Sequence, residues 1–157
     1  MPRTSYKRQR PKAEPVYKSI EVAKLINYLM VDGKRTVAEN VVYSAMEELK
    51  KDGQDALTVL KQAISNVSPT YEVKPRRLGG ASYLVPTEVR KDRKLFLSLN
   101  WILTAASSRS NKEYPAFYKK LVAEIQEAAA NTGQAVSKRA QTEKLADANK
   151  AFSHLKW

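Results

Sequence analysis

The chain contains no cysteine and a single histidine, His154, among its 157 residues. Without cysteine there are no disulfide bonds, thiolate metal sites or cysteine nucleophiles, and the composition fits a reducing compartment. One histidine cannot build a multi-histidine metal site, and its place near the C-terminus gives no arrangement with serine and aspartate for nucleophilic catalysis. No dinucleotide fingerprint or paired metal-ligand motif occurs. We therefore expect no enzyme, no metal and no other cofactor.

Long hydrophobic runs are also missing. No stretch approaches the roughly 18 consecutive apolar residues that a membrane span requires, and residues 1–12 lack the apolar segment of a signal peptide. Pro2 and Pro11 bracket that segment and disfavour the helix of an amphipathic targeting peptide. We therefore expect no membrane partner.

Acidic residues are scarce relative to basic ones. The chain has 28 Lys and Arg against 16 Asp and Glu, which gives a formal net charge of +12. Its hydrophobic fraction of 43% is ordinary and allows a core without covalent cross-links. Such an excess of positive charge indicates a polyanion as the partner.

Apolar residues recur at intervals of three and four over most of the chain, which predicts a mainly α fold. We expect a bundle of about six helices with one protruding two-stranded β-hairpin. On length, residues 1–157 are predicted to form a single domain. Its parts are a basic N-terminal arm (1–18), a helical core (19–70 and 91–148), the hairpin (71–90) and a basic C-terminal tail (149–157).

Capping residues predict where the helices begin and end. The expected first residues or caps are Ser19, Thr36 with Glu39 as a capping box, Asp55, Asp92, and Pro115 at the first position of a fifth helix. Gly33 and Pro69 are the expected ends of the first and third helices.

The hairpin is predicted around the dipeptide Gly79-Gly80, since a two-residue turn needs positive φ at both central positions. Pro75 and Pro86 lie within the two strands and would interrupt the hydrogen bonds of a central strand. Neither strand should therefore have neighbours on both sides. We expect a ribbon that projects from the helices and is marginally stable by itself.

The positive charge is unevenly distributed. Residues 36–68 hold three basic and five acidic residues, the composition of an ordinary water-facing surface. Residues 74–94, which cover the hairpin and its base, hold seven basic and two acidic residues. Charge on an exposed strand also protects against aggregation, but three separate basic runs outside the apolar stripes favour binding of nucleic acid.

Two short features admit different interpretations. The loop from Asp32 to Arg35 lacks the upstream glycine and strand of a phosphate loop, so we interpret it as a helix-to-helix turn that places Lys34 and Arg35 for phosphate contact. Tyr83 lies among arginines, where it suits stacking on an unpaired base and packing across the strands equally well.

These patterns define a set of candidate nucleic-acid contacts. They are Arg3, Lys7, Arg8, Arg10, Lys34, Arg35, Lys74, Arg76, Arg77, Gly79, Gly80, Tyr83, Arg90, Lys91, Arg93, Lys94, Arg109, Lys138, Arg139, Lys150 and Lys156. Two other functions stay open on charge alone. One is a helical regulator that binds duplex DNA, and the other is an architectural module that binds acidic proteins.

Four parts of the sequence resemble one known family. The first is a set of residues around the first loop: Ser19, Glu21, Leu25, Ile26, Gly33, Lys34, Arg35, Val41, Val42 and Ala45. The others are the hairpin from Glu72 to Arg90, the segment from Thr132 to Arg139, and the C-terminal segment from Ala148 to Trp157. Together these motifs are similar to small-subunit ribosomal protein seven, bacterial type, over essentially the whole chain.

The resemblance implies a ribosomal protein of the small-subunit head. It implies a primary binder of the 3′ major domain of the small-subunit rRNA that starts assembly of that domain. The hairpin would lie near the exit-site tRNA and the mRNA exit path, beside small-subunit ribosomal protein eleven and other head proteins. The location implied is the ribosome of the cytoplasm, with an organellar matrix or stroma also open. Lys34, Arg35, Arg76 and Arg77 would contact rRNA or tRNA, and Gly79 and Gly80 would form the tip.

Overall fold

The structure is a computed structural model that describes residues 12–51, 53 and 55–155. In these residues six α-helices and one hairpin follow in chain order, as expected, and a short 3₁₀ helix that was not expected comes after them. The elements are α1 (Ile20–Leu29), α2 (Arg35–Lys51), α3 (Ala56–Val67), β1 (Tyr71–Leu78), β2 (Ala81–Glu88), α4 (Lys91–Ser108), α5 (Phe117–Ala129), α6 (Gly133–Ala148) and η1 (Lys150–His154). None of the helices in the described ranges is long and apolar enough to cross a membrane.

Two of the predicted helix caps are confirmed. The Ser19 hydroxyl accepts a hydrogen bond from the amide of Val22 at the start of α1. The Asp55 carboxylate accepts bonds from the amides of Leu57 and Thr58 at the start of α3. Each side chain satisfies amides that have no partner within their helix.

Three predicted starts are wrong by one or two residues. The Lys34 carbonyl already accepts the first helical bond of α2, so Thr36 lies inside the helix, and Glu39 pairs with Arg35 instead of closing a capping box. Asp92 lies in the first turn of α4, where its charge suits the positive end of the helix dipole. Pro115 precedes α5, whose N-cap position is Ala116.

One predicted helix end and both predicted terminal segments also differ. The backbone leaves helical geometry at Met30, so α1 ends before Gly33, and Gly33 instead forms the turn to α2 with φ of +71°. Residues 149–157 are not simply a tail, because Lys150–His154 form η1. At the other terminus, the predicted arm is too long. Glu14 is 2% exposed and Tyr17 packs against the helical core, so these residues belong to the folded part.

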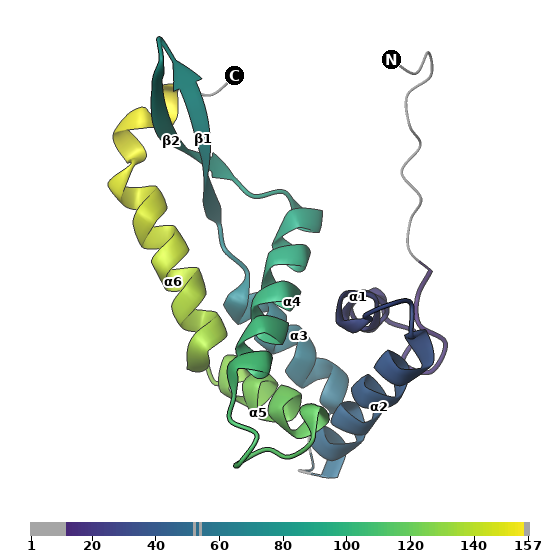
Figure 1. Ribbon diagram of the computed structural model, residues 1–157. Coiled ribbons are helices and arrows are strands. Elements are labelled where there is room, and N and C mark those ends of the chain that lie inside the picture. Colours follow the sequence, from purple (N-terminus) through teal and green to yellow (C-terminus); the bar gives the residue numbers. More distant parts are fainter. Residues whose placement is uncertain (1–11, 52, 54, 156–157) are drawn as a thin grey trace, which may run out of the picture.

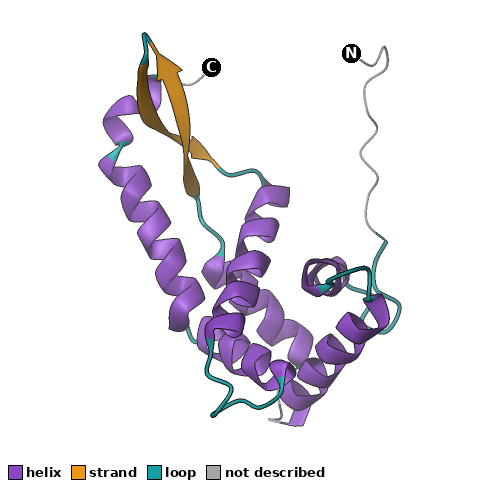
Figure 2. Cartoon of the chain, in the orientation of Figure 1, coloured by secondary structure: helices purple, strands orange, loops and turns teal. Residues whose placement is uncertain are grey.

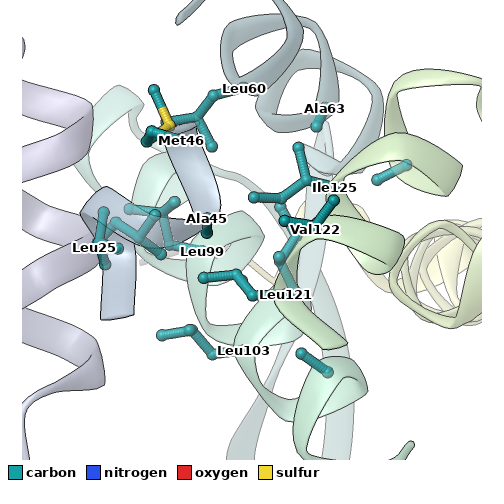
Figure 3. Close-up of a cluster of buried hydrophobic side chains, with 14 of the residues drawn as sticks. Leu25, Ala45, Met46, Leu60, Ala63, Leu99, Leu103, Leu121, Val122 and Ile125 are labelled. Carbon is teal, nitrogen blue, oxygen red and sulfur yellow. The ribbon is translucent and has the colours of Figure 1, made fainter. Parts of the chain in front are cut away.

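The hydrophobic core lies between α2, α3, α4 and α5 (Figure 3), with one face of α1 added. α5 contacts α2, α3, α4 and α6, and α4 contacts α1, α3, α5 and α6, so these two helices hold the centre. The largest fully buried side chains of the cluster are Leu25, Ile26, Met46, Leu49, Leu60, Leu99, Ile102, Leu121 and Ile125. Burial of each such side chain contributes about 1.5–3 kcal/mol.

The hairpin extends away from the core, but it does not stand alone as predicted. Figure 1 shows α6 and η1 running beside it, and both contact it. Val85 is 1% exposed, and Pro86 is also buried. Among the described residues the sheet has two strands only, which confirms that the prolines leave each strand without a second neighbour.

Candidate nucleic-acid interface

The tip of the hairpin is exposed on all sides. Residues 77–82 are all exposed, and Gly79 and Gly80 have φ of +57° and +89°, as the predicted turn requires. A Cβ atom added at either glycine would find no other atom within 4 Å. Arg77 is paired across the strands with Ser82, one residue from the turn. The chain thus presents a narrow cationic tip with space around it.

The base of the hairpin is organised by a glutamate that the sequence analysis did not single out. Glu72 has a side chain only 12% exposed, and its two oxygens lie 3.5 Å from Lys74 Nζ and 3.2 Å from Arg93 Nε. The Arg93 guanidinium also lies 5.1 Å from the centre of the Phe96 ring. Glu72 therefore joins β1 to α4 and holds two of the candidate cations, which remain about half exposed.

Other basic residues continue from the base into α4. Arg90 and Lys91 are exposed, and Lys94 is half-buried. The amide of Val89 donates to the carbonyl of Thr70, which closes the hairpin at this point. The predicted cluster at the foot of the hairpin is therefore assembled in the fold, on the last residue of the connection and the first turn of α4.

The turn between α1 and α2 forms a second cationic group. Asp32 and Gly33 both have positive φ, and the amide of Lys34 donates to the carbonyl of Val31. Lys34 is exposed directly before α2, which has no acidic residue in its first turn. Arg35 pairs with Glu39 at 2.7 Å, but its side chain is still 53% exposed. The N-terminal end of α2 is thus open to an anion.

A third group lies on α6 and η1. Lys138 and Lys150 are exposed, as an RNA contact requires. Arg139 differs, because its guanidinium donates to the carbonyl of Asn66 and lies 3.7 Å from Glu143. Its side chain is only a quarter exposed, so it acts first as a tether between α6 and α3.

Arg109 does not join any of these groups. Its guanidinium donates to Glu124 at 2.6 and 3.0 Å and to Glu127 at 2.5 Å, and its side chain is 13% exposed. Burial lowers the pKa of Arg109, but the hydrogen bonds that it donates to both glutamates outweigh burial and raise the pKa above its ordinary value. Because Arg109 is paired with two carboxylates of the same chain, it is not part of the proposed interface.

Tyr83 has a packing partner within the chain. Its ring centre lies 5.3 Å from that of Phe152 on η1. This contact between the two rings joins the hairpin to the C-terminal segment. Arg76, opposite Tyr83 in the register, is half-buried.

The cationic groups lie on different parts of the molecule. In Figure 1 the hairpin stands at the upper left and α4 begins beside its foot, whereas α2 begins at the lower right, away from the hairpin. Figure 2 shows the strands rising beyond the helices at the upper left. The remaining predicted contacts, Arg3, Lys7, Arg8, Arg10 and Lys156, lie outside the described residues.

No side-chain chemistry other than anion contact stands out in this region. In the described part of the chain no three His, Asp or Glu side chains form a group able to hold a metal ion. What the geometry provides is lysine and arginine on a projecting ribbon, on a helix start and on an outer helix. This arrangement defines a class, helical proteins with separated cationic limbs that are suited to contact with a polyanion.

Comparison with known proteins gives the family. The family model described as ribosomal protein S7p/S5e matches residues 1–150. The chain therefore belongs to the ribosomal protein S7p/S5e family, which confirms the resemblance in the sequence.

Curated relatives agree with this assignment. A protein of Thermoanaerobacter pseudethanolicus is 46% identical over 159 aligned residues that cover all of both chains. Proteins of Caldanaerobacter subterraneus subsp. tengcongensis and Dictyoglomus turgidum are 48% and 50% identical, each over 145 residues that cover 92% of this chain and 91% of the relative. All three are named small ribosomal subunit protein uS7, and all three come from bacteria.

Proposed function

We propose that the protein is a structural constituent of the small ribosomal subunit in the bacterial cytoplasm. It binds the 3′ major domain of the small-subunit rRNA as a primary binder and nucleates assembly of the head. Its hairpin lies near the exit-site tRNA and the mRNA exit path, beside small-subunit ribosomal protein eleven and other head proteins. Family membership and the names of the bacterial relatives support this proposal.

The observation that carries the RNA-binding part is the exposed hairpin tip. Residues 77–82 are exposed although they lie on an ordered ribbon that η1 and α6 support from one side. A protruding cationic tip that lies outside the packed part of its own fold is suited to a groove or junction of another molecule. Lysine and arginine supply phosphate contacts, and the shape of the folded RNA supplies specificity.

The helices act as a rigid platform in this mechanism. The core holds the start of α2, the start of α4 and the hairpin at fixed separations, so several phosphates are contacted together. No bond is made or broken, and affinity comes from release of the counterions that those phosphates had condensed.

Chemical footprinting of the 3′ domain, with and without the protein, tests the proposal. We expect the parent to protect a defined set of nucleotides. Arg77→Ala should weaken protection at the subset that faces the hairpin tip, because it removes one cation from an exposed strand. Lys51→Ala is the control, since Lys51 is exposed at the opposite end of α2 and pairs with Glu48.

Competition separates this function from its rivals. Structured rRNA should displace the labelled 3′ domain far better than duplex DNA of equal charge. A preference for duplex DNA, or binding to acidic proteins that survives nuclease treatment, would refute the proposal.

A further inference from the structure

A buried carboxylate on α5 caps a different helix. Glu124 is fully buried, and its Oε2 accepts both bonds from Arg109. Its other oxygen, Oε1, accepts a 3.1 Å hydrogen bond from the amide of Ala135, the third residue of α6. Thr132, at the N-cap position, makes no side-chain cap bond. Glu124 therefore supplies from outside the cap that α6 lacks in its own sequence.

The surrounding contacts join three segments at this point. The Glu127 carboxylate also binds Arg109, and a Cβ atom at Gly133 would lie 2.9 Å from Glu127 Oε2. The buried Lys120 Nζ donates to the carbonyl of Arg109 and to Asn111. We call Arg109, Lys120, Glu124 and Glu127 the α6 anchor. It fixes the end of α4, the middle of α5 and the start of α6 relative to one another.

Apolar packing alone holds α6 weakly. Of its sixteen residues only Ala135, Val136 and Ala146 are buried, and all three are small or medium in size. Beyond the first turn, the bond from Arg139 to the Asn66 carbonyl is a second tether. The direction of α6 relative to the core is thus determined largely by polar contacts near its N-terminal end.

The same helix supports the hairpin. The amide of Thr70, just before β1, donates to Glu143 of α6 at 2.9 Å. Tyr83 of β2 packs on Phe152 of η1, which follows α6 directly. Figure 1 shows the C-terminal end of α6 beside the foot of the hairpin and η1 beside its strands, and both contact the hairpin. A change in the angle of α6 would therefore change where the hairpin tip lies.

We propose that Arg109 and Glu124 are positioning residues for RNA binding. They touch no RNA, but they fix the angle of α6 and thereby preorganise the hairpin relative to the cationic ends of α2 and α4. This inference rests on the proposed function. A single rigid arrangement lets all the phosphates be contacted without an ordering cost on binding.

The size of the effect follows from populations. If the anchor is broken and the competent arrangement falls to roughly a tenth of the molecules, the apparent Kd rises about tenfold. The contacts in the bound state are unchanged, so the dependence of log Kd on log salt concentration keeps its slope.

Glu124→Gln tests the anchor in the full chain. A glutamine can keep the bond from the Ala135 amide or face Arg109 with its oxygen, but it cannot do both, because its amide nitrogen is a donor. Glu48→Gln is the matched control, since Glu48 is a more exposed carboxylate that binds Lys51 at 3.0 Å and joins no other helix. Arg109→Lys, which keeps the charge but loses the planar fork, is the second variant.

The first measurement is made on the free protein. Because the chain lacks cysteine, spin labels can be attached at Ser82→Cys on the hairpin tip and Ser65→Cys on α3, both exposed positions. We expect one narrow distance distribution for the parent and for Glu48→Gln. Glu124→Gln should broaden or shift it, and Arg109→Lys should give an intermediate result. Parent-like distributions in both anchor variants would overturn the inference.

The second measurement is affinity for the 3′ domain over a range of salt concentrations, below the melting temperature of every variant. We expect Glu124→Gln to bind about tenfold more weakly with the slope of the parent. Arg109→Gln, which removes the charge, tests direct contact: a slope reduced by about one for this variant would mean that Arg109 binds a phosphate. An unchanged affinity of Glu124→Gln would mean a purely structural role, and either result overturns the inference. A parent that does not bind the RNA would instead refute the proposed function, and the distance measurement would still test the anchor. If Glu124→Gln does not fold, Arg109→Lys decides the question in both assays.

Discussion

At the scale of single residues, Glu14 holds the first described part of the chain on α2. It is 2% exposed, and its carboxylate accepts bonds from the amides of Val16 and Tyr17 and from the hydroxyl of Tyr43. Burial acts to raise the pKa of Glu14, but these three bonds outweigh it and lower the pKa below its usual value of 4.5. The same contact, led by the hydrogen bond to Glu14, raises the pKa of Tyr43 from 10.0 to about 12.

Removal of the Tyr43 hydroxyl should destabilise the protein by an amount that depends on pH, because the hydrogen bond to Glu14 needs an ionised carboxylate and a protonated hydroxyl. Tyr43→Phe is expected to cost about 1.5–3 kcal/mol at neutral pH, because a hydrogen bond to a buried charged group is lost. Below pH 4.5 the parent loses this advantage as Glu14 becomes protonated, and between about pH 10 and 12 it loses it as Tyr43 ionises. The free energy of unfolding of the parent should therefore exceed that of Tyr43→Phe by the largest margin between pH 4.5 and pH 10.0.

Urea unfolding of both proteins across the pH range measures this difference. Tyr28→Phe is the control, because Tyr28 is more exposed and its ring meets Phe96 edge-on. A difference between parent and Tyr43→Phe that stays constant from acid to alkaline pH would show that the two groups are not coupled.

Residue-level predictions succeeded where the partner is local. Ser19 and Asp55 cap helices through amides two or three residues away, so the pattern in the sequence contains both partners. The prediction of Arg109 as an RNA contact misses its internal pairing, because the sequence does not show that it pairs with Glu124, fifteen residues away on another helix. Glu72 was not singled out because Arg93, twenty-one residues away, gives it its role.

At the scale of elements, the hairpin depends on its turn and on its support. The Gly79-Gly80 dipeptide predicts the turn because only glycine adopts positive φ without steric cost. Pro75 and Pro86 predict a two-stranded ribbon because they cannot donate to a further strand. The sequence did not predict that α6 and η1 cover part of the ribbon. The weak apolar periodicity of α6 gives no indication of which element it packs against.

Gly80→Ala should loosen the hairpin without disturbing the helices. With φ of +89° and no atom within 4 Å of the added Cβ, the cost is conformational, about 1–2 kcal/mol. Amide exchange should accelerate in β1 and β2 and stay unchanged in α3 and α5. Gly53→Ala is a matched control, because φ is +77° there and the added Cβ is equally unobstructed, but the glycine lies between α2 and α3. Equal effects of both substitutions on the hairpin would contradict a local cost.

At the scale of the whole molecule, the formal charge of +12 is divided among separate limbs. The hairpin, its base, the start of α2 and the outer face of α6 and η1 each present exposed cations. Other cations, such as Arg109, are paired with carboxylates of the same chain. Net charge thus overstates the number of cations available for a partner, and the fold decides which ones remain.

Affinity for the 3′ domain should consequently fall steeply with salt. If about six to ten phosphates are neutralised, binding should weaken by about a thousandfold or more between roughly 50 and 200 mM salt, by analogy with duplex DNA. Filter binding at a series of salt concentrations gives the slope, and Lys51→Ala should leave it unchanged. An affinity independent of salt would contradict binding through phosphates.

The sequence by itself determined the elements and the kind of partner. Periodicity, glycines and prolines act over a few residues, and net charge is a sum over composition, so neither needs the folded chain. Only the tertiary structure decided which cations are exposed, that Glu124 caps α6, and that α6 supports the hairpin. These properties depend on contacts between residues far apart in sequence, whose burial and pairing arise only when the helices pack together.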